Sequence, residues 1–158
     1  MSVTALYNRD IMLELAREAL IQAPPEVVYD LIADVDRYED WNPWNFRGYG
    51  GPAVAGRNVE MSLKLGRHIL NVRHEVLESR RAEKLTMRDV GWYRKVADGV
   101  RTRELKSVGE GTLYRVVLTV KGPLAWFVRL YFGRDLEAGL TAESDAIKRT
   151  AEQRWRLG

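Results

Sequence analysis

Hydrophobic and polar residues alternate over much of the chain between residues 59 and 121. In the clearest stretch, residues 112–121, one side of an extended chain would carry Tyr114, Val116, Leu118 and Val120. Short glycine-containing turns separate the stretches, which favours an antiparallel meander over a parallel sheet. The same alternation predicts further strands at 59–65, 68–76, 84–89, 92–97 and 100–107.

The periodicity becomes helical after Gly122 and Pro123. From Leu124 to about Arg154 no proline interrupts the chain, and a mostly apolar stripe predicts one long helix. The stripe comprises Leu136, Leu140, Glu143, Ile147, Ala151 and Arg154. The start of this helix, GPLAWFVRLYFG, has more aromatic residues than one stripe accommodates. Burial of these residues against the sheet is the favoured interpretation. The alternatives are a gate to the cavity, a dimer contact and an edge that touches a membrane.

A shorter helical pattern precedes the strands. Pro24 and Pro25 suit a helix start, and Asn42 before Pro43 breaks the register because a residue before proline avoids the α region. The apolar face of this pattern consists of Val28, Leu31, Ile32 and Val35.

Two sets of residues carry a resemblance to a known family: Ile21, Ala23, Pro24, Glu26, Val28, Tyr29, Leu31, Asp34, Tyr38, Trp41, Asn42 and Pro43, and, in the last helix, Leu140, Ile147, Lys148 and Glu152. Their order resembles the START-related SRPBCC superfamily, and within it the polyketide cyclase/dehydrase and lipid-transport group. The resemblance implies an α+β helix-grip fold. In that fold a curved antiparallel sheet of about seven strands wraps around a long C-terminal helix, two short helices follow strand 1, and a cavity holds an apolar ligand.

On the strength of this resemblance, residues 11–23 are predicted as the first strand, although their composition also suits a helix. One side of that strand would carry Leu13, Leu15, Ala19 and Ile21, with Arg17 between them. Residues 1–10 show no period and are interpreted as a loose lead-in.

The length of 158 residues predicts a single domain over residues 1–158, and 46% hydrophobic with 30% charged residues is ordinary for a globular protein. No apolar run approaches the roughly 18 residues of a membrane span, and the start lacks the order of a signal peptide. The absence of cysteine agrees with a reducing compartment, so a cytoplasmic protein without stable membrane insertion is expected. A net charge of +3 gives no argument for nucleic acid.

The glycine-rich stretch RGYGGPAVAGR, residues 47–57, has glycine spacing reminiscent of a dinucleotide site. That interpretation is rejected, because Pro52 interrupts the stretch and a strand rather than a helix follows it. The stretch is predicted to form a flexible lip to the cavity. No cofactor is expected.

Alternation places ten residues around the predicted cavity: Leu15, Met61, Leu63, Leu70, Val72, Met87, Trp92, Tyr114, Val116 and Leu140. For any single one of them, ordinary core packing is the more common alternative. His74 shares their face between Val72 and Val76, and is the candidate general base or hydrogen-bond partner of a ligand carbonyl. His68 lies roughly 20 Å along the same strand, too far away to share a metal ion, so no metal site is predicted.

Charged residues expected to point inward are Arg17, Asp89, Arg94 and Glu104. A buried charge needs a partner, and a structural ion pair is favoured over binding of a polar ligand group. Arg17 and Asp89 are nevertheless retained as ligand-binding candidates. By contrast, Arg101 and Arg103 are interpreted as a solvated strand face.

Three functions remain open from the sequence. The first is binding of a hydrophobic or aromatic small molecule, such as a lipid or a polyketide-like compound. The second is a cyclase, aromatase or dehydratase in which His74 or a cavity carboxylate moves a proton. The third is a protein-binding module that uses the aromatic helix entry, and a homodimer is compatible with all three.

Overall fold

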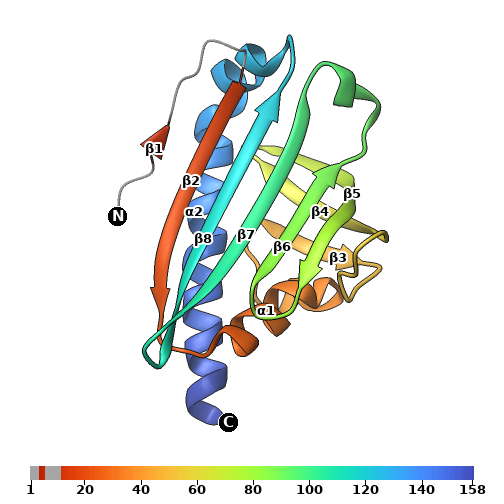
Figure 1. The fold of residues 1–158 in the computed structure, drawn as a ribbon. Helices are drawn as coiled ribbons and strands as arrows, with labels where there is room; N and C mark the ends of the chain where they lie inside the picture. Colours follow the sequence, from red (N-terminus) through yellow and green to blue (C-terminus); the bar gives the residue numbers. More distant parts are fainter. Residues whose placement is uncertain (1–3, 6–11) are drawn as a thin grey trace.

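The computed structural model describes residues 4–5 and 12–158 of the chain, and shows one curved antiparallel sheet wrapped around a long helix (Figure 1). The sheet has the strand order β1-β2-β8-β7-β6-β5-β4-β3. Its strands are β1 (Thr4–Ala5), β2 (Met12–Ile21), β3 (Asn45–Tyr49), β4 (Asn58–Leu65), β5 (His68–Arg80), β6 (Lys84–Asp89), β7 (Asp98–Val108) and β8 (Gly111–Lys121). The helices are α1 (Pro25–Ala33), the 3-10 helices η1 (Val35–Asp40) and η2 (Trp92–Lys95), and α2 (Ala125–Leu157). Apart from β1, the predicted lead-in lies outside the described residues.

This architecture confirms the predicted helix-grip fold, including the long C-terminal helix and the two short helices after the first long strand. The N-terminal prediction also holds in detail. Pro25 opens α1, and the predicted apolar face of Val28, Leu31, Ile32 and Val35 is fully buried. In β2 the side chains of Leu13, Leu15, Ala19 and Ile21 are buried on the side facing the helix layer.

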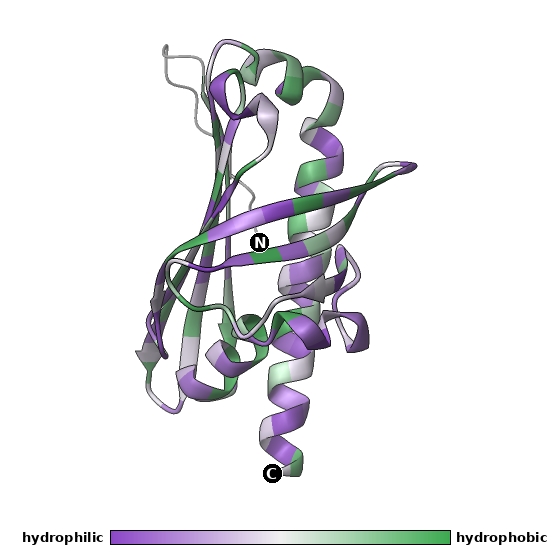
Figure 2. Ribbon diagram, turned by 90° about the vertical axis from the view of Figure 1, so that its right-hand side faces the viewer, coloured by the Kyte–Doolittle hydropathy of each residue, from purple (hydrophilic) through white to green (hydrophobic). Residues whose placement is uncertain are grey.

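The sheet curves strongly enough for its β3–β5 part to cross α2, whereas β2, β8 and β7 run along it (Figures 1 and 2). The C-terminal half of α2 packs against β2 and α1 through Leu140, Ile147 and Ala151, which are buried. The space between the sheet and the C-terminal half of α2 is therefore filled by side chains, and any remaining hollow must lie toward the start of α2.

Two predictions of secondary structure were wrong. Residues 92–97, predicted as a strand, form the 3-10 helix η2 and the turn after it. Of the glycine-rich stretch predicted as a loop at the cavity, residues 47–49 belong to β3, and residues 50–57 form a loop that does not line the cavity. At Gly48 a side-chain Cβ would lie 2.4 Å from the Cγ1 atom of Val35, so glycine there allows η1 to approach the strand closely.

Two glycines inside α2 provide a matched test of helix packing. A Cβ on Gly139 would lie 2.3 Å from Nε1 of the buried Trp44, whereas a Cβ on Gly133 would meet nothing closer than Arg129 Cγ at 3.9 Å. Alanine should therefore stabilise at position 133 by about 0.5–1 kcal/mol through helix propensity. Gly139→Ala should instead destabilise by about 1–3 kcal/mol because Trp44 must move. Urea unfolding of both variants measures this, and a stabilised Gly139→Ala protein would contradict the packing.

Candidate functional site

A cavity of about 250 Å³ lies between the concave face of the sheet and the first half of α2. Most of its wall is apolar and comes from strands β4, β5 and β8 and from α2. The apolar lining consists of Trp44, Leu63, Leu65, Leu70, Val72, Ala97, Leu118, Val120, Val128, Phe132 and Leu136. The polar side chains of the lining belong to Asn45, His74, Asp89, Tyr93 and Arg101.

The structure brings five of the predicted site residues together on this lining: Leu63, Leu70, Val72, His74 and Asp89. Six others are buried but do not line the cavity: Leu15, Met61, Met87, Tyr114, Val116 and Leu140. The residues that line the cavity and those that do not lie on the same face of the sheet, and they differ in their position along the strands. On β8, for example, Tyr114 and Val116 pack in the filled half, whereas Leu118 and Val120 on the same face reach the cavity.

The remaining predicted residues lie elsewhere. Trp92 is 92% exposed because η2 replaces the predicted strand, and Arg94 in η2 is exposed for the same reason. Glu104 is also exposed, so the expectation that it points inward was wrong. Arg17 donates to the Asp145 carboxylate at 2.7 Å and to the Thr141 hydroxyl at 3.1 Å, which is the structural ion pair favoured by the sequence.

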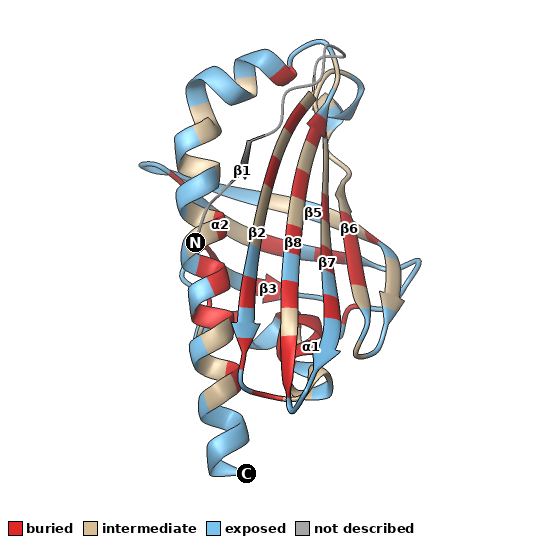
Figure 3. Cartoon of the chain, turned by 60° about the vertical axis from the view of Figure 1, so that its left-hand side comes forward, coloured by how far each residue is buried: buried red, intermediate tan, exposed pale blue. Residues whose placement is uncertain are grey.

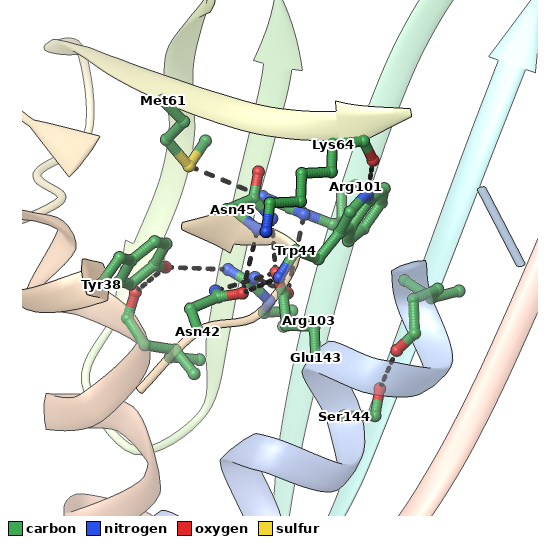
Figure 4. Close-up of polar contacts among 12 residues, drawn as sticks. Tyr38, Asn42, Trp44, Asn45, Met61, Lys64, Arg101, Arg103, Glu143 and Ser144 are labelled. Atoms are coloured by element: carbon green, nitrogen blue, oxygen red, sulfur yellow. Dashed lines mark hydrogen bonds and ion pairs between the residues drawn. The ribbon is translucent and has the colours of Figure 1, made fainter. Parts of the chain in front are cut away.

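A buried carboxylate, that of Glu143 on α2, lies at the centre of a cluster of polar side chains (Figure 4). One of its oxygens accepts hydrogen bonds from the side-chain amides of Asn42, at 3.0 Å, and of Asn45. The other accepts from Arg103 and lies 3.6 Å from Nη1 of Arg101. Helix α2 is thereby connected to β7 and to the segment that enters β3.

Arg101 and Arg103 are buried, with exposed fractions of 6% and 1%, so their interpretation as a solvated strand face was wrong. Burial would raise the pKa of Glu143, but the two guanidinium groups and the Asn42 amide outweigh burial and lower it to about 2. Burial lowers the pKa of Arg101 and the like charge of Arg103 adds to this effect, whereas contact with Glu143 raises the pKa of Arg103. The carboxylate therefore compensates Arg103 first and Arg101 less completely.

The turn at Asn42 and Pro43 positions this cluster. Asn42 accepts hydrogen bonds from the backbone amides of Trp44 and Asn45, each at 3.0 Å, and so shapes the entry to β3. The Trp44 indole donates to the carbonyl of Lys64 at 2.9 Å, and its ring lies 5.5 Å from the Arg101 guanidinium. The sequence carried one signal of this cluster, because Glu143 is an acidic residue within the apolar stripe of the last helix.

Three residues of the cavity lining each carry a buried polar atom that has no hydrogen-bond partner within the described part of the chain: Nδ1 of His74, Oδ1 of Asn45 and Nε of Arg101. Unpaired buried polar atoms are uncommon in proteins, and each is a place where a bound molecule can supply the missing partner. Burial lowers the pKa of His74 to about 3, and the charges of Arg101 and Arg103 add to the effect, so its imidazole is neutral near pH 7.

Asp89 lies on the same sheet wall, on β6 between β5 and β7, and is already engaged. Its carboxylate accepts hydrogen bonds from the Tyr93 hydroxyl and, at 3.0 Å, from the Gly91 amide. Asp89 and His74 are register partners on β6 and β5, so a carboxylate and an imidazole line one part of the cavity. Residues 4–5 and 12–158 contain no group of three or more histidine, cysteine or carboxylate side chains placed to hold a metal ion.

The first prediction from the site concerns Glu143→Gln. This change leaves two buried arginines without an anion, so we expect unfolding to require about 3–5 kcal/mol less than in the wild type. The control is Glu137→Gln, an exposed position on the same helix, which should change stability by no more than about 0.5 kcal/mol. Equal stability of both variants in urea would show that the cluster is not a structural requirement.

The second prediction concerns acid stability. Because the pKa of His74 is about 3 in the folded protein and near 6.5 when unfolded, its contribution is complete above about pH 6.5 and is lost progressively below it. Between about pH 7 and pH 5 this loss amounts to about 2 kcal/mol. His74→Asn should remove that slope from the pH dependence of unfolding, whereas His68→Asn, at an exposed position, should keep it. An unchanged slope in His74→Asn would contradict the assignment.

Solved structures with the same fold include aromatase/cyclases. The di-domain aromatase/cyclase StfQ from the steffimycin biosynthetic pathway matches 92% of this chain at 14% identity with a TM-score of 0.75, and the chain spans about half of StfQ, 52% of its length. The ZhuI aromatase/cyclase from Streptomyces sp. R1128 matches at 17% identity and a TM-score of 0.72, covering 90% of this chain and 95% of that one.

A further structure with this fold is norcoclaurine synthase from Thalictrum flavum, solved in complex with dopamine and hydroxybenzaldehyde. It has 12% identity and a TM-score of 0.70, and the match covers 97% of this chain and 96% of that one. At these identities the matches establish the fold alone. No curated protein sequence matches the chain. A family model, however, matches residues 12–152, and this chain belongs to the family described as polyketide cyclase / dehydrase and lipid transport.

Proposed function

We propose that the protein binds a small, mostly apolar molecule that carries one anionic or strongly polarised oxygen group. The apolar wall of the cavity would hold the body of the ligand, and Arg101 would bind the oxygen. Family membership supports binding or conversion of a small molecule in general. The observation that carries the finer proposal is the unpaired Nε of the buried Arg101 on the cavity lining.

The charge balance around the cavity floor favours an anion. Among the described residues, the buried charged side chains are Arg101, Arg103 and Glu143, so one carboxylate faces two guanidinium groups. The other charged residue of the lining, Asp89, already accepts hydrogen bonds from Tyr93 and Gly91. A buried charge without a partner is costly, and a ligand oxygen at Arg101 would supply that partner. The neutral imidazole of His74 and the amide oxygen of Asn45 offer further hydrogen-bonding positions on the same lining.

The third prediction uses two matched probes, naphthalene-2-carboxylate and its neutral amide. The wild type should bind the carboxylate at least roughly tenfold more tightly in titration calorimetry, because a charge-assisted hydrogen bond contributes more than a neutral one. In Arg101→Met both probes should bind about equally. If neither probe binds, or if the preference survives in Arg101→Met, the proposed ligand class is wrong.

A second candidate function is proton transfer within the same cavity, as in a cyclase or dehydratase. Its support is the pairing of His74 and Asp89 across neighbouring strands on the lining. A pKa of about 3 makes His74 a weak base near pH 7, which favours hydrogen bonding to the ligand over proton abstraction. Once a substrate is known, turnover that is unchanged in a ligand-binding His74→Ala variant would remove this residue from catalysis.

A further inference from the structure

The end of the molecule at which α2 begins exposes large apolar side chains. We define the aromatic end by Trp92, Leu124, Trp126, Phe127, Leu130 and Tyr131. Trp126, Leu130 and Tyr131 are 56%, 70% and 61% exposed, so the expectation that this stretch is buried against the sheet was wrong. The first turns of α2 are hydrophobic over much of their length and largely exposed (Figures 2 and 3).

The entry of α2 has two apolar faces rather than one. Val128, Phe132 and Leu136 line the cavity. On the other side Trp126 and Leu130, and likewise Phe127 and Tyr131, are spaced four residues apart and form an outer face. The surplus of aromatic residues in this stretch is thereby explained, since the inner face lines the cavity and the outer face is largely exposed, with only Phe127 and Tyr131 beside the β4–β5 turn.

Positive charge gathers at the same end. The segments 61–74, 90–97 and 120–134 contain eight basic residues and no acidic one, whereas the rest of the chain has 17 basic and 22 acidic residues. The segments meet at this end: the Leu124 amide donates to the Val96 carbonyl at 2.9 Å, and the β4–β5 turn lies beside Phe127 and Tyr131. Five acidic residues directly border the segments: Glu60, Glu75, Asp89, Asp98 and Asp135. Of these, Glu60 pairs with Arg73, Asp98 pairs with Arg88, and Asp89 accepts hydrogen bonds from Tyr93 and Gly91.

We infer that the aromatic end docks on the surface of a bilayer that contains anionic lipids. Tryptophan and tyrosine favour the interface between lipid and water, and lysine and arginine are attracted to anionic headgroups. A second copy of this chain fits less well, because a two-fold contact would bring two equally basic ends together. None of the described helices is long and apolar enough to cross a bilayer, so docking remains at the surface.

The cavity wall reaches the protein surface at this end. Leu70 lines the cavity and is 40% exposed, and Phe132 borders both the cavity and the groove beside Phe127 and Tyr131. Docking would therefore place the cavity entrance against the lipid, and an apolar ligand could transfer without crossing water. This consequence rests on the proposed function, whereas docking itself does not.

The test is co-sedimentation with phosphatidylcholine vesicles, with and without about 30% phosphatidylglycerol. The wild type should pellet with the anionic vesicles, and less so as salt is raised. Trp126→Ser combined with Leu130→Ser should abolish pelleting, and Arg94→Gln combined with Lys95→Gln should weaken it roughly tenfold. The matched controls lie at the far end of α2: Trp155→Ser, 51% exposed in the wild type, and Arg154→Gln combined with Arg156→Gln should pellet as the wild type does.

Failure to pellet with anionic vesicles, or equal pelleting of the Trp126 and Trp155 variants, would overturn the inference. It would also be overturned if the wild type were an oligomer that the Trp126 variant dissociates, because a second copy would then cover this surface. A cooperative urea unfolding transition shows that each variant is folded, and binding of naphthalene-2-carboxylate is measured beside it. This binding also separates failure of the docking inference from failure of the proposed function.

Discussion

The carboxylate of Glu143 is the contact on which the inner architecture depends. It lies on α2, is almost inaccessible to solvent, and accepts hydrogen bonds from β7 and from the turn at Asn42. Such a group is tolerated in a protein interior only when it is paired on several sides. It therefore fixes the position of the helix relative to the sheet at the level where the filled core ends and the cavity begins.

The cavity follows from this geometry. Toward the C-terminus from Glu143, Ile147 and Ala151 are buried in the filled core, and toward the N-terminus, beyond Leu140, the side chains of Leu136, Phe132 and Val128 form one wall of a hollow. Since two arginines share one carboxylate, Arg101 on the lining of the hollow is only partly compensated by Glu143, beside mostly apolar walls. These features define the proposed ligand class, and the exposed aromatic and basic residues above them define the proposed surface of approach.

The sequence was sufficient for the fold but only partly for the site. Alternation predicted the strands from residue 59 onward, apart from the wrong one at 92–97, and the stripe of α2 predicted the long helix, because burial of one face leaves a periodic signal. The strand β2 was predicted from the family resemblance, and β3 was not predicted. The face of β7 could not be decided in this way, since one side carries Val100 and the other Leu105, and so Arg101 and Arg103 were missed. Alternation also does not tell which residues on one face of a strand line the cavity. Val116 and Leu118 lie on the same face of β8, yet of these two only Leu118 lines the cavity.

The central claim is that Arg101 presents an unpaired donor to a ligand oxygen inside this cavity. A crystal structure of the wild-type protein with naphthalene-2-carboxylate tests it most directly. We expect the ring between α2 and β5, with one carboxylate oxygen about 3 Å from Nε of Arg101. A structure in which the cavity is closed by its own side chains, or in which the carboxylate points away from Arg101 into solvent, would contradict the claim.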